Sequence, residues 1–137
     1  MTYEQFNDYC RSLSATTMVV QWGNSFVWKV GGKVFAIGGW EKIDEPAFTF
    51  KASDYDFHLL QDEEGFRAAP YMASRGLKWI QQFKQIEESD EELQHYIKES
   101  HRMVSLGLTK KNTKRPGAKP EMISQYMNKK VNWVRFR

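Results

Sequence analysis

The stretch SFVWKVGGKVFAI, residues 25–37, predicts a β-hairpin. Valine, isoleucine and aromatic residues, which favour strands, lie on both sides of Gly31 and Gly32. Both glycines can adopt the positive φ that a two-residue type I′ turn requires, because neither has a Cβ atom. We therefore expect two antiparallel strands, at residues 25–30 and 33–37, joined by this turn.

Three further segments outside this hairpin have strand-like patterns. β-Branched and aromatic residues recur at residues 17–21 and 47–51, and residues 77–83 alternate less regularly between the two sides of a strand. Five strands are thus expected, four of them consecutive along the chain.

Three helices are predicted by capping residues followed by apolar residues at helical spacing. They cover residues 3–13 after the capping box of Thr2 and Gln5, a short segment between Ser53 and Gly65, and residues 89–107, where Gly107 provides a stop signal. The order α-β(4)-α-β-α lacks the regular alternation of a parallel, doubly wound sheet. The predicted fold class is α+β, with helices packed on one face of an antiparallel sheet.

The composition indicates one domain joined to a basic segment. The chain has 137 residues, of which 41% are hydrophobic, enough to form one core. Residues 109–137 hold nine basic residues and one acidic residue, a net charge of +8, whereas residues 1–108 hold 11 basic and 16 acidic residues, a net charge of −5. We expect residues 1–108 to form the α+β domain and residues 109–137 to form a flexible basic tail.

The single cysteine, Cys10, and the sequence around the first residues also bear on where the protein functions. One cysteine cannot form an internal disulfide, and residues 1–10 lack the basic and then apolar regions of a signal peptide. Residues 12–28, the longest uncharged stretch, contain too many polar residues to cross a bilayer. A soluble protein of the reducing cytoplasm is expected, with no membrane association.

Motifs for catalysis, cofactors or metals do not emerge from the spacing of the polar residues. Gly32 and Lys33 are followed by Val34, so the phosphate-loop pattern fails. His95 and His101 are six residues apart on one helix, which places them on different faces. We therefore predict a protein that is not an enzyme and that needs neither a cofactor nor a metal.

Cations interleaved with aromatic residues are the pattern that remains. Such interleaving suits the neutralisation of phosphates together with stacking on bases or sugars. An ordinary solvated surface for the body cations and a solubilising extension for the tail are the alternatives. The candidate nucleic-acid-binding residues are Lys51, Arg67, Tyr71, Arg75, Lys78, Trp79, Lys110, Lys111, Lys114 and Arg115.

Several segments together resemble the MmcQ/YjbR-like family of small bacterial proteins, which are often labelled DNA-binding. They are MTYEQFNDYC at residues 1–10, VWKVGGKVFA at 27–36, FTFKAS at 48–53, APYM at 69–72 and the helix at 89–108. The resemblance implies an α+β fold similar to frataxin (CyaY) and to secretion chaperones, and a DNA-binding role. Lys51 and a basic residue after Tyr71 match the family's pattern, but residues 73–79 form a longer run than in many members.

The expected function is therefore weak, non-specific binding of DNA. The alternative is a protein-partner or chaperone-like module that holds a peptide or dimerises through a sheet edge. The dependence on salt separates the two, because binding to phosphates weakens steeply with salt and binding through apolar surface does not.

Overall fold

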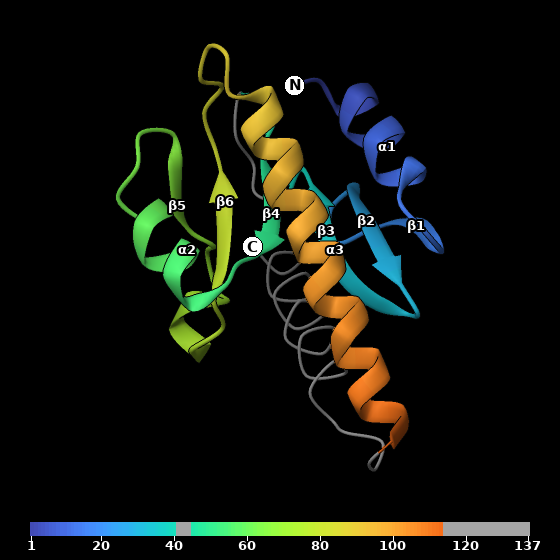
Figure 1. Ribbon diagram of the computed structural model, residues 1–137. Helices are drawn as coiled ribbons and strands as arrows, with labels where there is room; N and C mark the ends of the chain where they lie inside the picture. Colours follow the sequence, from blue (N-terminus) through green and yellow to red (C-terminus); the bar gives the residue numbers. More distant parts are fainter. Residues whose placement is uncertain (41–44, 114–137) are drawn as a thin grey trace.

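The computed structural model describes residues 1–40 and 45–113, with side chains described as far as residue 108. Within these residues the chain forms a six-stranded antiparallel sheet in the order β1-β2-β3-β4-β6-β5, together with three α-helices (Figure 1). The predicted α+β class is confirmed. The elements are α1 (Tyr3–Ser12), β1 (Thr16–Gln21), β2 (Ser25–Val30), β3 (Lys33–Gly38), β4 (Phe48–Lys51), α2 (Asp54–Leu60), β5 (Phe66–Ala68), the 3₁₀ turn η1 (Ala73–Arg75), β6 (Trp79–Gln82) and α3 (Asp90–Thr113).

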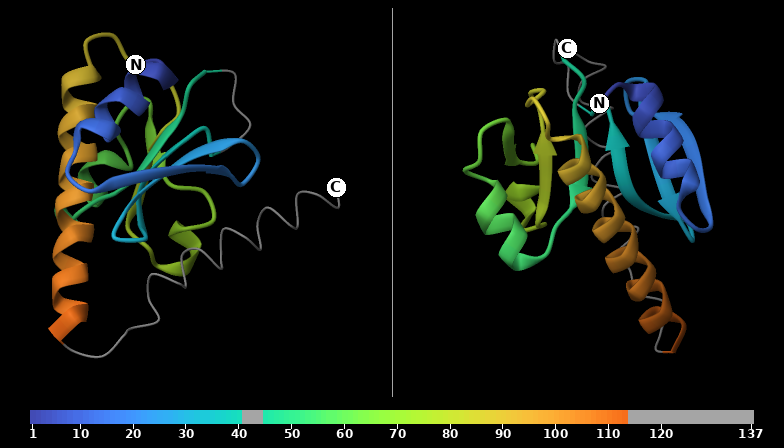
Figure 2. Two further views of the ribbon diagram at one scale, coloured as in Figure 1. Left: turned by 90° about the vertical axis from the view of Figure 1, so that its right-hand side faces the viewer. Right: turned by 45° about the horizontal axis from the view of Figure 1, so that its top comes forward.

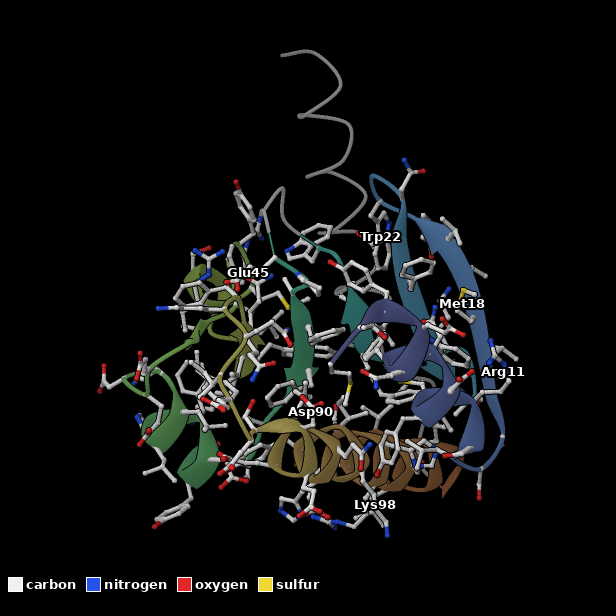
Figure 3. All side chains as sticks on the ribbon, turned by 90° about the horizontal axis from the view of Figure 1, so that it is seen from above. Arg11, Met18, Trp22, Glu45, Asp90 and Lys98 are labelled. Atoms are coloured by element: carbon white, nitrogen blue, oxygen red, sulfur yellow. The ribbon has the colours of Figure 1, made fainter. Side chains whose placement is uncertain are left out.

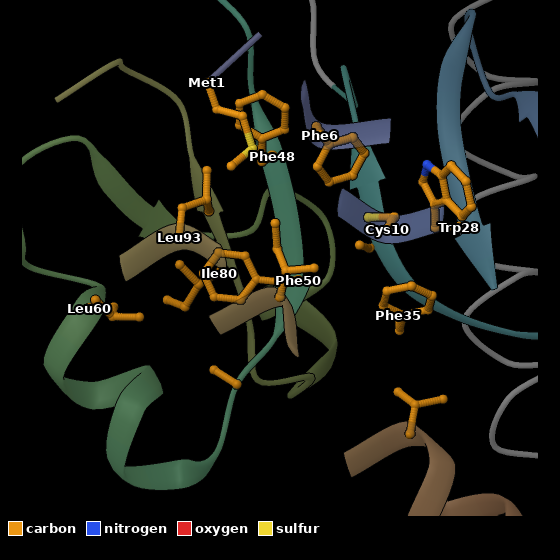
Figure 4. Packing of buried hydrophobic residues seen from close by; sticks show 14 of the residues in the cluster. Met1, Phe6, Cys10, Trp28, Phe35, Phe48, Phe50, Leu60, Ile80 and Leu93 are labelled. Atoms are coloured by element: carbon orange, nitrogen blue, oxygen red, sulfur yellow. The ribbon is translucent and has the colours of Figure 1, made fainter. Parts of the chain in front are cut away.

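All three helices pack on one face of the sheet, as predicted, and the main core lies between them and the strands (Figures 2 and 4). Apolar residues of the helices meet large aromatic residues of the central strands; they include Phe6, Cys10, Leu60, Leu93 and Ile97 from the helices and Phe35, Phe48 and Phe50 from the strands. We call this side of the sheet the helix face. The capping box of Thr2 and Gln5 begins α1, and Ser53 caps α2, both as predicted.

The other side of the sheet, the back face, carries a second apolar cluster. It consists of Trp22, Val27, Val34, Ile37, Trp40, Ala69, Met72 and Trp79, with Tyr71 and Leu77 packed against it. Strands β2 and β3 therefore bury side chains on both faces. Burial on both faces explains why the stretch at residues 25–37 is apolar almost throughout instead of alternating with polar residues.

The hairpin of β2 and β3 has the predicted turn. Gly31 and Gly32 have φ values of 58° and 81°, and Val30 pairs with Lys33 across the turn. The strand register shifts between Trp28 and Lys29.

Two predictions about the elements were wrong. The short strand β5 was missed, so the sheet has one strand more than the order α-β(4)-α-β-α allows. Helix α3 does not end at Gly107 but continues to Thr113, which places the first residues of the predicted flexible tail in a helix. The contact of Leu108 with the core outweighs the helix-interior cost of one glycine, about 1 kcal/mol.

Within the described part of the chain, no helix is long and apolar enough to span a membrane. The likeness to frataxin and to secretion chaperones stays a prediction.

Candidate nucleic-acid interface

Lys51 and Arg67 extend from the back face of the sheet, near one of its edges. Phe48 and Phe50 of β4 belong to the core on the helix face, so the alternation of side chains directs Thr49 and Lys51 to the back. Lys51 pairs with Trp79, and Arg67 pairs with Gln81, across the shared neighbour β6. Strands β4 and β5 are separated by two strand spacings, and the two cations are offset by two residues along the strands. The Cα atoms of Lys51 and Arg67 therefore lie about 12 Å apart.

The guanidinium of Arg67 is held in a fixed orientation. Its Nε and Nη2 atoms donate hydrogen bonds to Oε1 of Gln81 at 2.9 and 2.7 Å, and its Cζ lies 4.8 Å from the centroid of the Phe83 ring. Gln81, which is fully buried, in turn donates to Oγ1 of Thr49 at 3.2 Å. The remaining N–H groups of this half-buried guanidinium keep their capacity to bind an anion.

Lys51 has a firmly anchored backbone and a half-buried side chain. Its backbone N–H donates to Oγ of Ser100 on α3 at 3.0 Å. The Lys51 ammonium forms no ion pair with any residue in the described ranges 1–40 and 45–108. It therefore offers an uncompensated positive charge beside Arg67.

Tyr71 and Arg75 lie on the segment between β5 and β6, which packs against the back face through Ala69 and Met72. Tyr71 has a positive φ of 69° and an edge contact with Trp40, at 6.5 Å between ring centroids. It is half-buried, whereas Arg75, at the end of η1, is exposed. This segment thus adds a cation and one aromatic ring on the same side of the sheet as Lys51 and Arg67.

Lys78 lies beside this surface but is directed differently. It precedes Trp79, so its side chain points away from the back face, and its Nζ lies 2.9 Å from Oδ1 of Asp54 at the start of α2. The Lys78 ammonium, by hydrogen bonding and by its charge, lowers the pKa of the Asp54 carboxyl below its usual value. Asp54 therefore neutralises one of the predicted binding cations.

Trp79 cannot serve as the contact surface that the sequence suggested. Only 1% of its surface is exposed, because the indole packs in the back-face cluster. Lys110 and Lys111 belong to α3, but their side chains lie outside the described residues, and so do Lys114 and Arg115. The structure thus places Lys51 and Arg67 on the back face and Tyr71 and Arg75 on the segment that packs against that face, and it directs Lys78 and Trp79 elsewhere.

Two features were missed by sequence reasoning. The buried polar residue Gln81 orients the guanidinium of Arg67, and buried Ser100 anchors the backbone of Lys51. No spacing signal could have singled them out. A second cationic region, on α3, contains Lys98, His101 and Arg102 and borders a cleft of about 470 Å³. Its spacing of three and four residues was visible in the sequence.

The region on α3 is locally neutralised. Arg102 binds Glu99 through Nε and Nη2, which lowers the pKa of the Glu99 carboxyl. His101 contacts the backbone oxygen of Ser14 at 2.8 Å. Lys98 points away from the sheet (Figure 3). This region has its own acidic partner and lacks aromatic residues at the cleft, so it is the weaker candidate.

Histidine, cysteine and acidic side chains are the groups that could bind a metal ion or act as nucleophiles. Among the described residues, no three His, Cys, Asp or Glu side chains gather in an arrangement that could hold a metal ion. Cys10 lies on the buried side of α1, and this burial raises the pKa of its thiol far above the usual value. The thiol therefore stays protonated at neutral pH.

Comparison with known proteins gives one positive result. The family described as YjbR matches residues 11–103, more than half of the chain. No curated protein matches the sequence. The matched range contains the whole sheet, including Lys51, Arg67, Tyr71 and Arg75.

Proposed function

The chain belongs to the YjbR family, and from its back-face cations we propose that it binds DNA through the phosphate backbone, with little sequence selectivity and without catalysis. The bacterial cytoplasm is the proposed location. We call Lys51, Arg67, Tyr71 and Arg75 the cationic edge.

The observation that carries the proposal is the placement of Lys51 and Arg67 on one face of the sheet. The chain is net negative over residues 1–108, so cations scattered among acids would be neutralised. Lys51 instead has no acidic partner in the described residues, and Arg67 is bound by a neutral amide rather than a carboxylate. Both therefore keep their positive charge for an outside anion.

The orientation of Arg67 favours phosphate as that anion. A planar guanidinium can donate two parallel hydrogen bonds to a phosphate, and less entropy is lost on binding when the side chain is already fixed. Gln81 and Phe83 provide this fixation. Contacts of this kind position the nucleic acid without reading its sequence.

The burial of Trp79 argues further for backbone contacts. Stacking on bases requires an exposed aromatic face, and Tyr71 is the aromatic residue of the cationic edge that is still partly exposed. A single half-buried ring gives little discrimination between bases. We therefore propose weak selectivity, with residues 109–137, which carry a net charge of +8, adding long-range attraction to the phosphates.

The experiment is a salt titration of binding to duplex and single-stranded DNA. The proposal expects a dissociation constant of roughly micromolar or weaker, typical of non-specific contacts. If about four to six cations engage, a log-log salt slope of roughly −4 to −5 follows, since each neutralised phosphate contributes about −0.9. An absence of salt-sensitive binding at low ionic strength would reject the proposal.

A protein-partner or chaperone-like role is the second candidate, favoured by a different feature. Strand β1 lies at the edge of the sheet and exposes Val19 and Val20. An extended peptide could add to this edge. Binding there would resist salt and would leave the cationic edge free for DNA.

A further inference from the structure

Strand β1 presents an unpaired edge of the sheet. All six of its residues pair with β2 in one continuous register, and no described strand pairs with its outer side. Figure 1 shows β1 at the end of the sheet opposite to β5. In Figure 3 the label of Met18, a residue of β1, marks the strand on the outside of the sheet. The backbone N–H and C=O groups on this outer side are therefore available to another strand.

The two edges of the sheet are protected to very different degrees. At the far edge, β5 has only three residues, carries Arg67 and is flanked by α2. A short, charged and covered strand is a common means of preventing unwanted pairing. In contrast, β1 has no charged residue, no proline and no bulge against β2, and no charge occurs anywhere in residues 12–28.

Exposed apolar side chains lie along the same edge. Val19 is 40% exposed and Val20 is 55% exposed. Because they are consecutive in a strand, they point to opposite faces of the sheet. A strand added beside β1 would cover both, which a partner lying on only one face could not do.

We propose that β1 pairs with β1 of a second copy of this chain, antiparallel and about a two-fold axis perpendicular to the sheet. The absence of charge allows this self-pairing, since two identical charged strands would place like charges opposite each other. With the axis centred on Val19, Val19 lies opposite its own copy and Met18 lies opposite Val20, and apolar pairs of this kind stabilise antiparallel strands. Both sets of helices then lie on the same side of one continuous sheet.

The size of the contact predicts a weak dimer. Five paired residues of β1, 17–21, with two valines on each side, provide less than the roughly 800 Å² per partner of a standard interface. A dissociation constant in the micromolar range follows. Since the paired strands are uncharged and the domains are net negative, added salt should leave dimerisation unchanged or strengthen it, the opposite of its effect on DNA binding.

The test is sedimentation equilibrium of the full chain over a range of concentrations up to about 1 mM, which detects even weak association. The wild type should show a monomer–dimer equilibrium. Val19→Lys should weaken it by at least about tenfold, because the two edge lysines repel each other. The control Leu106→Lys, at an exposed leucine of α3, should keep the dimer.

A second variant guards against a loss of folding in Val19→Lys. Oxidation of Val19→Cys should give a disulfide-linked dimer, whereas Tyr55→Cys, on the exposed surface of α2, should not. A wild type that stays monomeric at every concentration would overturn the proposal, even if an extended peptide bound the same edge. A dimer that Val19→Lys does not weaken would overturn it as well.

Discussion

The side chain of Ser100 on α3 donates its hydroxyl proton to the backbone oxygen of Phe35 at 2.6 Å, deep in the protein. The hydroxyl oxygen of Ser100 in turn accepts the backbone N–H of Lys51 at 3.0 Å. One hydroxyl thus joins α3 to the adjacent strands β3 and β4. It also fixes the backbone of a residue that belongs to the cationic edge.

Replacing Ser100 with alanine should destabilise the fold. The change leaves a buried carbonyl and a buried N–H without this partner, which typically costs about 1–3 kcal/mol. Urea unfolding measures the difference. Ser12→Ala is the matched control, because its hydroxyl donates to the oxygen of Tyr9 at the exposed end of α1. Equal midpoints for the two variants would contradict the proposed role of Ser100.

The two glycines of the β2–β3 turn should differ in their tolerance of substitution. Both have positive φ, so alanine strains the backbone by about 1–2 kcal/mol at either position. A Cβ at Gly31 would also clash with the side chain of Leu108, whereas nothing lies within 4 Å of one at Gly32. Gly31→Ala should therefore be the more destabilising in urea.

The variant Leu108→Ala separates the two causes. When Leu108 is replaced by alanine, the clash with its side chain disappears and only the backbone strain remains. Gly31→Ala and Gly32→Ala should then lower the free energy of unfolding by nearly the same amount. A difference that persists without the Leu108 side chain would show that contact with α3 is not its origin.

The buried thiol of Cys10 should make stability fall at alkaline pH. Burial raises its pKa in the folded chain, while the unfolded thiol ionises near pH 8.5. The unfolded state therefore loses this proton first, and stability falls by up to about 1.4 kcal/mol per pH unit above about pH 8.5. Urea unfolding between about pH 8 and pH 9.5 measures this, and Cys10→Ala should flatten the dependence. An identical slope in that variant would assign the effect to other groups.

Removing the carboxylate of Asp54 should strengthen DNA binding. Asp54→Asn frees Lys78 from its ion pair and removes a negative charge close to the cationic edge. Because the pair is exposed, folding stability should change little. Asp8→Asn is the matched control: it makes the same change of charge at the exposed pair of Asp8 and Arg11 on α1. Equal gains in affinity would indicate an effect of net charge alone.

Local signals account for the parts of the fold that were predicted from the sequence. The turn at Gly31 and Gly32 and the caps at Thr2 and Ser53 depend on neighbouring residues, and the structure has them in place. Strand β5 depends instead on pairing with β6, and its three residues are too few to show an alternation. The continuation of α3 beyond Gly107 depends on the distant contact between Leu108 and the hairpin.

The candidate site was predictable to a similar extent. The alternation from Phe48 to Lys51 already directs Lys51 away from the aromatic core. In contrast, the burial of Trp79 results from packing with residues far apart in the sequence, such as Val27 and Trp40. The pairing of Lys78 with Asp54 likewise requires knowledge of how α2 lies beside β6.

The most direct test of the proposed DNA-binding surface compares two double variants that lose the same charge. Lys51→Gln with Arg67→Gln removes two cations from the back face, and Lys98→Gln with Arg102→Gln removes two from α3, on the helix face. Salt titrations of duplex DNA binding should show a slope shallower by about 1–2 for the first variant, since each lost phosphate contact contributes about 0.9. The second should keep a slope near that of the wild type, and equal slopes in the two variants would contradict the assignment of DNA binding to the cationic edge.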